Sequence, residues 1–272
     1  MSSINSKLYS NYETFGQQRG RLVVHVLSSY IVMPGSRVLD FGAGTGGIAL
    51  ECARAGATVH AIEPNAGKAC RLVAQAQAEH LNVSFLDTLP VLAQPYDAIV
   101  LLDVIEHLQN PEQWLHQLRS LLKPNGVIYM STPNKFSPAH LLLDPHFSVP
   151  LLSLASRRLV KWVTADVLKW QPSERQDFPE LFSFSTLMSL FSRAGFETTL
   201  VNRTVLDYAI AHPRSVWNRP LHLRLVRLLQ QNDVGRWLKW IVTDGHDGFN
   251  RWLNPTWYMI LQKKARFQTN RA

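Results

Sequence analysis

Short apolar runs alternate along the chain with longer segments in which apolar residues recur every three or four positions. The apolar runs cover residues 36–39, 58–62, 82–86, 96–102 and 127–130. The segments between them have the spacing of helices that bury one face. The run at 96–102 is almost wholly apolar, which is typical of a central strand buried on both faces. This alternation predicts an α/β sheet of parallel strands covered by helices.

A glycine-rich turn follows the first predicted strand, and an acid precedes it. Gly42, Gly44 and Gly47 have the G-x-G-x-x-G spacing that brings a backbone close to a nucleotide. Asp40 stands two residues before Gly42. Its carboxylate would repel the pyrophosphate of a dinucleotide but attract the sulfonium and ammonium groups of S-adenosylmethionine. The turn therefore favours S-adenosylmethionine as the ligand.

Further polar residues stand where later strands end. Glu63 lies 23 positions after Asp40, which suits hydrogen bonds from ribose hydroxyls, although it could also be a solvated acid at the next turn. Asp87 suits the adenine amino group, and its other interpretation is a surface acid. The carboxyl ends of parallel strands meet at one edge of the sheet, where ligands bind. The predicted cofactor site therefore also includes Phe41, Ala43, Pro64, Thr88, Asp103 and Val104.

Residues 36–134 resemble the class I S-adenosylmethionine-dependent methyltransferases, with 38–46 as the glycine motif. The segments 105–108, 122–127 and 131–134 resemble the branch that includes ubiquinone-biosynthesis O-methyltransferases. Residues 184–197 are similar to the helix and turn before that family's sixth strand, and 254–261 to its seventh. The resemblance implies a Rossmann-like, doubly wound, mostly parallel sheet of seven strands with an antiparallel last strand. It also implies methyl transfer to a small organic acceptor, at a hydroxyl oxygen.

The chain is expected to form one methyltransferase domain over 1–272, because its 46% hydrophobic residues suffice for one packed core. Cys52 and Cys70 lie in alanine-rich helical stretches, which predicts two buried thiols and no disulfide. No segment has the length of a membrane span or a signal core, so a cytoplasmic location is expected. The predicted parts are an N-terminal helical cap (1–34), a cofactor core (35–134), an insertion or lid (135–183), a helix and sixth strand (184–206), a second insertion (207–253) and the last strand (254–265).

Both insertions are expected to be largely helical and to shape an acceptor pocket above the cofactor. Trp237, Trp240 and Trp252 suggest walls for an aromatic or lipid-linked acceptor, or else simply pack the added helices. The net charge is +8, and residues 206–272 hold eleven basic residues against four acidic ones. An amphipathic helix at 220–242 could therefore contact an anionic membrane, although solvated helix faces also explain the charge. Nucleic-acid binding is not expected, because the sequence has no concentrated basic stripe with aromatic residues for base stacking.

The segment 9–32 is predicted to be helical and to lie over the cofactor. Tyr9, Tyr12, Arg19 or Arg21 would then cover the adenosyl group or meet the methionine carboxylate. The alternative is an ordinary packing helix with solvated arginines.

Methyl transfer is an in-line displacement in which the cofactor carries the chemistry, so the protein must align the reactants. A base is needed only if the acceptor loses a proton, and His107 and His146 are the candidates. Alternatively, His107 orients its loop.

Asp103, Glu106 and His107, with His146, are candidate metal ligands. The first three resemble the E-x-x-E-H motif of metal-assisted methyltransferases, with Asp103 in place of the first Glu. Many methyltransferases that bind no metal have a similar Glu-His-Leu turn, in which the side chains cap helices.

Two other functions share parts of this pattern. An NAD(P)-dependent oxidoreductase would share the glycine turn, but it would not explain Asp40, Asp87 or an antiparallel last strand. A catalytically silent partner subunit would keep the fold and the cofactor pocket without turnover.

Overall fold

The computed structural model describes residues 2–90, 94–172, 174–216, 223–224 and 240–264. Seven strands form one sheet in the order β3-β2-β1-β4-β5-β7-β6, and β7 runs antiparallel to both of its neighbours. The strands are β1 (Arg37–Phe41), β2 (Thr58–Ile62), β3 (Val83–Phe85), β4 (Tyr96–Leu102), β5 (Leu122–Pro133), β6 (Phe196–Leu200) and β7 (Thr256–Lys263). The predicted seven-stranded sheet with an antiparallel last strand is confirmed.

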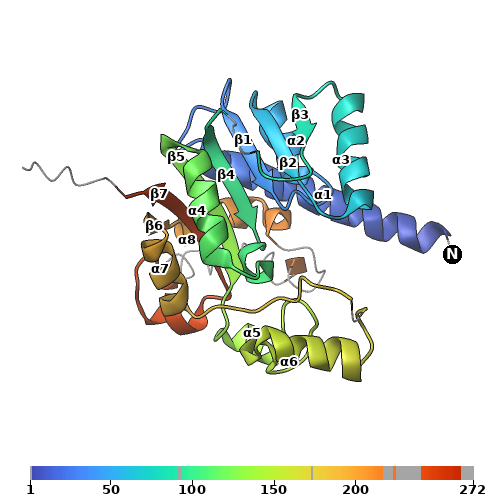
Figure 1. The fold of residues 1–272 in the computed structure, drawn as a ribbon, viewed down its shortest axis with the longest axis vertical. Coiled ribbons are helices and arrows are strands. Elements are labelled where there is room, and N and C mark those ends of the chain that lie inside the picture. The colour runs from blue at the N-terminus through green and yellow to red at the C-terminus, as the bar shows by residue number, and fades with distance from the viewer. Residues whose placement is uncertain (1, 91–93, 173, 217–222, 225–239, 265–272) are drawn as a thin grey trace, which may run out of the picture.

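Helices cover both faces of the sheet, as Figure 1 shows. Apolar residues of α4 and α7 pack on one face, and residues of α1, α2, α3 and α8 pack on the other. The α-helices are α1 (Ser2–Leu27), α2 (Gly47–Arg54), α3 (Ala66–Ala78), α4 (Pro111–Leu121), α5 (Pro138–Leu142), α6 (Arg157–Lys161), α7 (Phe184–Arg193) and α8 (Asn202–Ala211). Shorter helical turns are η1 (Ile105–His107), η2 (Leu152–Leu154), η3 (Trp162–Val167), η4 (Pro213–Ser215) and η5 (Phe249–Leu253). No described helix has both the length and the apolar content to cross a bilayer.

The N-terminal helix α1 packs directly on the first turn of α2. Glycines at the contact allow this, because a side chain at Gly47 would collide with the backbone of Gly16, and one at Gly20 with the carbonyl oxygen of Gly47. The close approach fixes how far α1 stands from the glycine turn. It therefore also fixes where the side chains of α1 meet the sheet.

The first insertion forms a lobe beyond the end of β5, with α5 and α6 as its helices (Figure 1). It has a small core of its own, in which Leu152, Val160 and Phe178 are buried. The lobe is less helical than predicted, because α5 and η2 are only five and three residues long and most described residues outside them and the joined segment of α6 and η3 (157–167) are loop. Prolines at 138, 145 and 150 restrict helices to single turns in its first half.

The cysteine prediction is half right, because Cys52 is buried and Cys70 is exposed. The buried positions of α3 are Ala69, Leu72 and Ala76, so Cys70 falls beside the buried stripe.

The second insertion enters the described structure only in part. Trp237 and most of the predicted helix at 220–242 lie outside the described residues. The side chains of Trp240 and Trp252 are exposed, and the ring of Trp252 lies 5.3 Å from that of Phe136.

A buried asparagine network anchors the end of this insertion to the sheet. The Asn250 amide donates to the carbonyl oxygens of Thr243 at 2.9 Å and Gly245 at 2.8 Å. Its side-chain oxygen accepts from Asn202 at 3.0 Å and from Asn254 at 2.8 Å. One side chain thus joins the start of α8 to the segment that leads into β7.

Candidate functional site

The glycine turn is held against β2 by backbone hydrogen bonds. The amides of Gly42 and Ala43 both donate to the carbonyl oxygen of Ile62 at 2.9 Å. Gly42 has a φ of 91°, and a side chain there would strike Val104 after β4. Phe41 and Ala43 are buried in the cores on either side of the sheet. These positions therefore offer a ligand their backbone, and the turn stays open above them.

Asp40 is almost fully buried within β1, directly below the turn. One of its oxygens, Oδ2, has no hydrogen-bond partner among the described residues. Burial raises the pKa of Asp40 to about 7, and the nearby charge of Glu63 adds to this, while the Ala49 amide and Arg19 oppose it. A buried carboxylate oxygen without a partner is the group that a cationic ligand would satisfy.

Glu63 connects the glycine turn to the end of β2. Its carboxylate accepts from the amide of Gly44 at 2.8 Å and from the amide of Asn65 at 2.9 Å. Glu63 and the exposed Asp87 line the same hollow of about 480 Å³, together with Pro64. The structure thus brings the residues predicted for ribose and adenine to one cavity. Thr88 is exposed next to Asp87.

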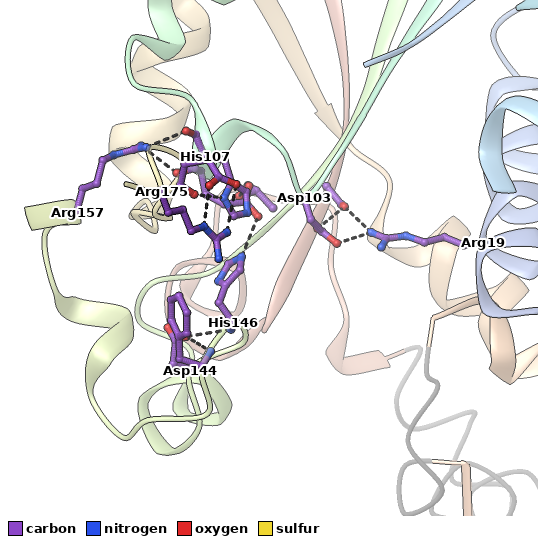
Figure 2. Close-up of polar contacts among 12 residues, drawn as sticks. Arg19, Asp103, His107, Asp144, His146, Arg157 and Arg175 are labelled. Carbon is purple, nitrogen blue, oxygen red and sulfur yellow. Dashed lines mark hydrogen bonds and ion pairs between the residues drawn. The ribbon is translucent and has the colours of Figure 1, made fainter. Parts of the chain in front are cut away.

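An ion pair between Arg19 of α1 and Asp103 lies at the carboxyl edge of the sheet, directly after β4. Arg19 Nη2 lies 2.6 Å from Asp103 Oδ2 and donates to Ser131 Oγ at 3.0 Å, and Ser131 Oγ donates to Asp103 Oδ1 at 2.7 Å (Figure 2). Burial by itself would raise the pKa of Asp103, but Arg19 and Ser131 outweigh it and lower that pKa. Asp103 adopts a φ of 55°, which is uncommon for a residue other than glycine.

Of the two arginines named on α1, only Arg19 faces this edge. Arg21 is half exposed and lies 3.5 Å from Glu51 of α2. The side chains of Tyr9 and Tyr12 lie outside the described part of the structure. Arg19 is therefore the group on α1 that is positioned to meet a ligand above β1 and β4.

A second polar cluster lies on the turn that follows β4. Ligand atoms of Glu106, His107 and His146 all lie within 4.8 Å of one another (Figure 2). Glu106 is fully buried and accepts from Thr132 Oγ1 at 3.0 Å through Oε2. Its other oxygen, Oε1, lies 3.8 Å from His146 Nε2 and has no hydrogen-bond partner among the described residues. The insertion thus supplies His146 to a turn that is 40 residues earlier in the chain.

The protonation of this cluster follows from burial and from one hydrogen bond. His107 Nδ1 lies 2.8 Å from the carbonyl oxygen of Asp177, so Nδ1 carries the proton and Nε2 is left as the basic atom. Burial, with the neighbouring His107, lowers the pKa of His146 to about 4. Burial, with the charge of Asp103, raises the pKa of Glu106 to about 8. The cluster is therefore built from groups that exchange protons or bind metal rather than from fixed charges.

The structure assembles three of the four candidate metal ligands. Asp103 turns away to Arg19 and Ser131, so it is not one of the grouped ligand atoms. One carboxylate and two imidazoles suit a divalent transition-metal ion. The buried, unpartnered atom Glu106 Oε1, which faces His146 Nε2, also fits such an ion, because the ion would satisfy an oxygen that now has no partner among the described residues.

Arg157 holds the η1 turn in place, a role that no sequence motif predicted. Its guanidinium donates to the carbonyl oxygens of Glu106 at 3.0 Å, His107 at 2.8 Å and Leu108 at 2.8 Å. The amide of Glu180 also donates to the Glu106 carbonyl oxygen, at 2.9 Å. The acceptors are backbone atoms, which leave no side-chain pattern in the sequence. The only signal was the basic stretch at 157–162.

A model of the methyltransferase domain matches residues 15–201 of the chain. A ubiquinone biosynthesis O-methyltransferase of Rickettsia typhi is 26% identical over 230 residues, which cover 77% of this chain and 87% of that protein. One from Rickettsia canadensis is 25% identical over 191 residues, 69% of this chain and 74% of that protein. One from Xanthomonas campestris is 32% identical over 121 residues, which are 43% of this chain and about half (51%) of that protein.

Solved structures show the same fold. Phosphoethanolamine N-methyltransferase 2 of Haemonchus contortus aligns with a TM-score of 0.53 at 15% identity, covering 90% of this chain and 52% of that one. Mycolic acid cyclopropane synthase CmaA1 aligns with a TM-score of 0.52 at 15% identity, covering 87% of this chain and 81% of that one. Both were solved with S-adenosylhomocysteine.

These comparisons favour neither a nicotinamide-dependent oxidoreductase nor a silent partner subunit. The antiparallel seventh strand, which an oxidoreductase would not explain, is present in the sheet. The chain belongs to the methyltransferase domain family and is a class I methyltransferase that uses S-adenosylmethionine as its methyl donor.

Proposed function

We propose that this enzyme transfers the methyl group to a hydroxyl oxygen of a small organic acceptor, aromatic or lipid-linked. The observation that carries the proposal is the cluster of Glu106 and His107, on the turn after β4, with His146 from the insertion; Glu106 is buried and both histidines are partly buried. A hydroxyl oxygen must lose its proton during transfer, and a partly buried base next to the cofactor edge can take it. The names of the relatives, all O-methyltransferases, support the same acceptor atom.

The cofactor is proposed to lie across the carboxyl edge of the strands. Asp40 would face the cationic part of the donor, and Arg19 its carboxylate. Glu63 would accept from the ribose hydroxyls, and Asp87 from the adenine amino group. Arg19 already pairs with a carboxylate, Asp103, so it can bind a second one without losing its charge partner.

His107 is the proposed base. Its Nδ1 proton is committed to the carbonyl oxygen of Asp177, which orients the ring and leaves Nε2 free for the acceptor. Burial lowers the pKa of both histidines, but at His146 the pKa falls to about 4, which makes His146 the poorer proton acceptor.

A divalent cation in this cluster is a second proposal, favoured by the three ligand atoms within 4.8 Å. Glu106, His107 and His146 would hold it. When bound, such an ion lowers the pKa of a coordinated hydroxyl group.

The test is transfer from methyl-labelled S-adenosylmethionine to matched aromatic acceptors that carry a hydroxyl or an amine at the same ring position. Mass spectrometry should find the label on the hydroxyl compounds. Methylation of the amines alone would refute transfer to oxygen. His107→Gln should lower turnover by about 10²-fold or more with an unchanged cofactor Kd.

The metal proposal is tested with the same assay. Exhaustive chelation should abolish transfer, and readdition of Zn²⁺, Mn²⁺ or Mg²⁺ should restore it. Elemental analysis of the purified protein gives a readout that does not depend on activity. Full turnover after chelation, with no ion copurified, would contradict the metal and leave His107 as the base.

A further inference from the structure

The inserted lobe exposes large apolar side chains that are not part of its own core. Leu142, Leu151, Leu159, Trp162, Val167 and Trp170, here called the outer apolar face, are 46–70% exposed. In the helical segment 157–167, Val160 and Ala165 are buried in the lobe core while Leu159, Trp162 and Val167 are exposed. This segment therefore presents apolar side chains to solvent as well as to the core, which an ordinary amphipathic surface helix does not need.

Basic side chains interleave with this face. Arg158 and Lys169 are exposed, and Lys161 is half-buried, within the same segment of α6 and η3. Between residues 157 and 170 the sequence contains one acid, Asp166. Surfaces that combine tryptophan, leucine and lysine side chains are typical of proteins that insert into the head-group region of an anionic bilayer.

A second copy of the chain fits this face less well. In a twofold dimer the same face meets itself, which would bring Arg158, Lys161 and Lys169 of both copies together. Like charges in a desolvated interface are costly. An anionic lipid surface offers apolar volume for Trp162 and Trp170 and negative charge for the lysines.

The structure also shows what docking would do for the enzyme. The inner side of the lobe holds the η1 turn through Arg157 and supplies His146. Its outer side carries Leu159, on the same helix α6 as Arg157, and Trp162, the first residue of η3. We propose that the outer apolar face is a peripheral docking surface for an anionic lipid bilayer, held by tryptophan and leucine insertion and by lysine and arginine contacts with the head groups.

The experiment is cosedimentation of the full chain with vesicles of phosphatidylcholine alone or mixed with phosphatidylglycerol. We expect binding to the mixed vesicles that weakens as salt is raised. The double variant Trp162→Ser/Trp170→Ser should weaken binding by about tenfold or more, because the interface-seeking rings are lost. Arg158→Glu/Lys169→Glu should weaken it by about tenfold or more, because each base near the surface contributes.

Two control variants replace exposed apolar residues outside the inserted lobe. Val32→Ser, on the loop after α1, and Trp240→Ser, in the second insertion, should leave binding unchanged. The affinity for S-adenosylhomocysteine, measured by calorimetry, should stay the same in every variant, which shows that the fold is kept.

Three results would overturn the proposal. One is a wild-type chain that binds neither kind of vesicle. Another is binding that is lost in Trp240→Ser but kept in both variants of the outer face. The third is a dimer, seen by analytical ultracentrifugation, that Trp162→Ser/Trp170→Ser converts to a monomer, because the face would then be a contact between copies.

Discussion

Replacing Asp40 by asparagine should make the free enzyme more stable and the cofactor complex weaker. The side chain is 1% exposed, and Oδ2 has no partner among the described residues. Asparagine has the same shape and can still accept the Ala49 amide through Oδ1. The substitution therefore removes a buried charge without opening a cavity.

The magnitude follows from the raised pKa. The pKa of Asp40 rises from 3.8 to about 7, and each unit is about 1.4 kcal/mol, so ionising this group in the folded protein costs about 4 kcal/mol. The unfolded chain releases this proton near pH 4 and the folded chain near pH 7. Stability from Asp40 is thus full below about pH 4 and lost as the pH rises toward 7. The variant has no such loss, so its advantage in unfolding free energy should grow by about 4 kcal/mol between about pH 4 and pH 8.

Cofactor affinity should increase with rising pH, whereas the stability contributed by Asp40 decreases. A cationic donor requires ionised Asp40, so wild-type affinity should rise up to tenfold per unit of pH until about pH 7 and then level off. Asp40→Asn should bind about 10–100-fold more weakly at about pH 8, because a charged hydrogen bond is lost. Its affinity should no longer depend on this proton.

Urea unfolding at several pH values and calorimetric titration measure the two effects. Titration in buffers of different ionisation enthalpy should show proton release by the wild type at about pH 6 and less by the variant. S-adenosylhomocysteine keeps the ammonium but has no sulfonium, so comparing the two ligands shows which cation Asp40 faces. Equal affinity of wild type and variant for both ligands at about pH 8 would refute the role given to Asp40.

Three further substitutions test how the site is supported. Arg157→Lys should lower turnover by about tenfold or more and leave the cofactor Kd unchanged, because one ammonium cannot hold three carbonyl oxygens in the fork geometry of a guanidinium. Arg158→Lys is the matched control, and equal turnover of the two variants would contradict the role given to Arg157. Asn250→Ala should lower the unfolding free energy by about 3 kcal/mol in urea, because five side-chain hydrogen bonds are lost inside the fold, and a change within about 0.5 kcal/mol would show that the network is not structural. Gly47→Ala should push α1 away from α2 and weaken cofactor binding through Arg19, and an unchanged Kd together with an unchanged melting temperature would argue against that contact.

The parts of the site that could be predicted depend on short spacings. Asp40 stands two residues before Gly42, and Glu63 follows the next strand, so the parallel-sheet rule alone places both at one edge. The cluster of Glu106 and His107 could likewise be located, because it directly follows the apolar run of β4.

The parts of the site that could not be predicted from the sequence involve contacts between segments that are far apart in the chain. Arg19 and Asp103 are 84 residues apart, and neither strand order nor helix periodicity sets their distance. It is set by the glycine contact between α1 and α2, which the sequence shows only as three glycines among many. Arg157 recognises carbonyl oxygens, so the partner residues could have any side chain. The sequence could therefore name Arg19 as a candidate, but it could not separate it from Arg21.

The sequence predicted a lid role for both insertions and placed a membrane contact at 220–242, whereas we propose both roles for the first inserted lobe. Its inner side fixes Glu106 and His107 through Arg157 and adds His146, so the lobe completes the chemical site rather than only covering it. Its outer side is apolar and basic. The helical segment formed by α6 and η3 covers residues 157–167, and Arg157 at its start joins the lobe to the η1 turn. A displacement of the lobe should therefore also displace the proposed base, and we expect it to disturb the alignment that methyl transfer needs.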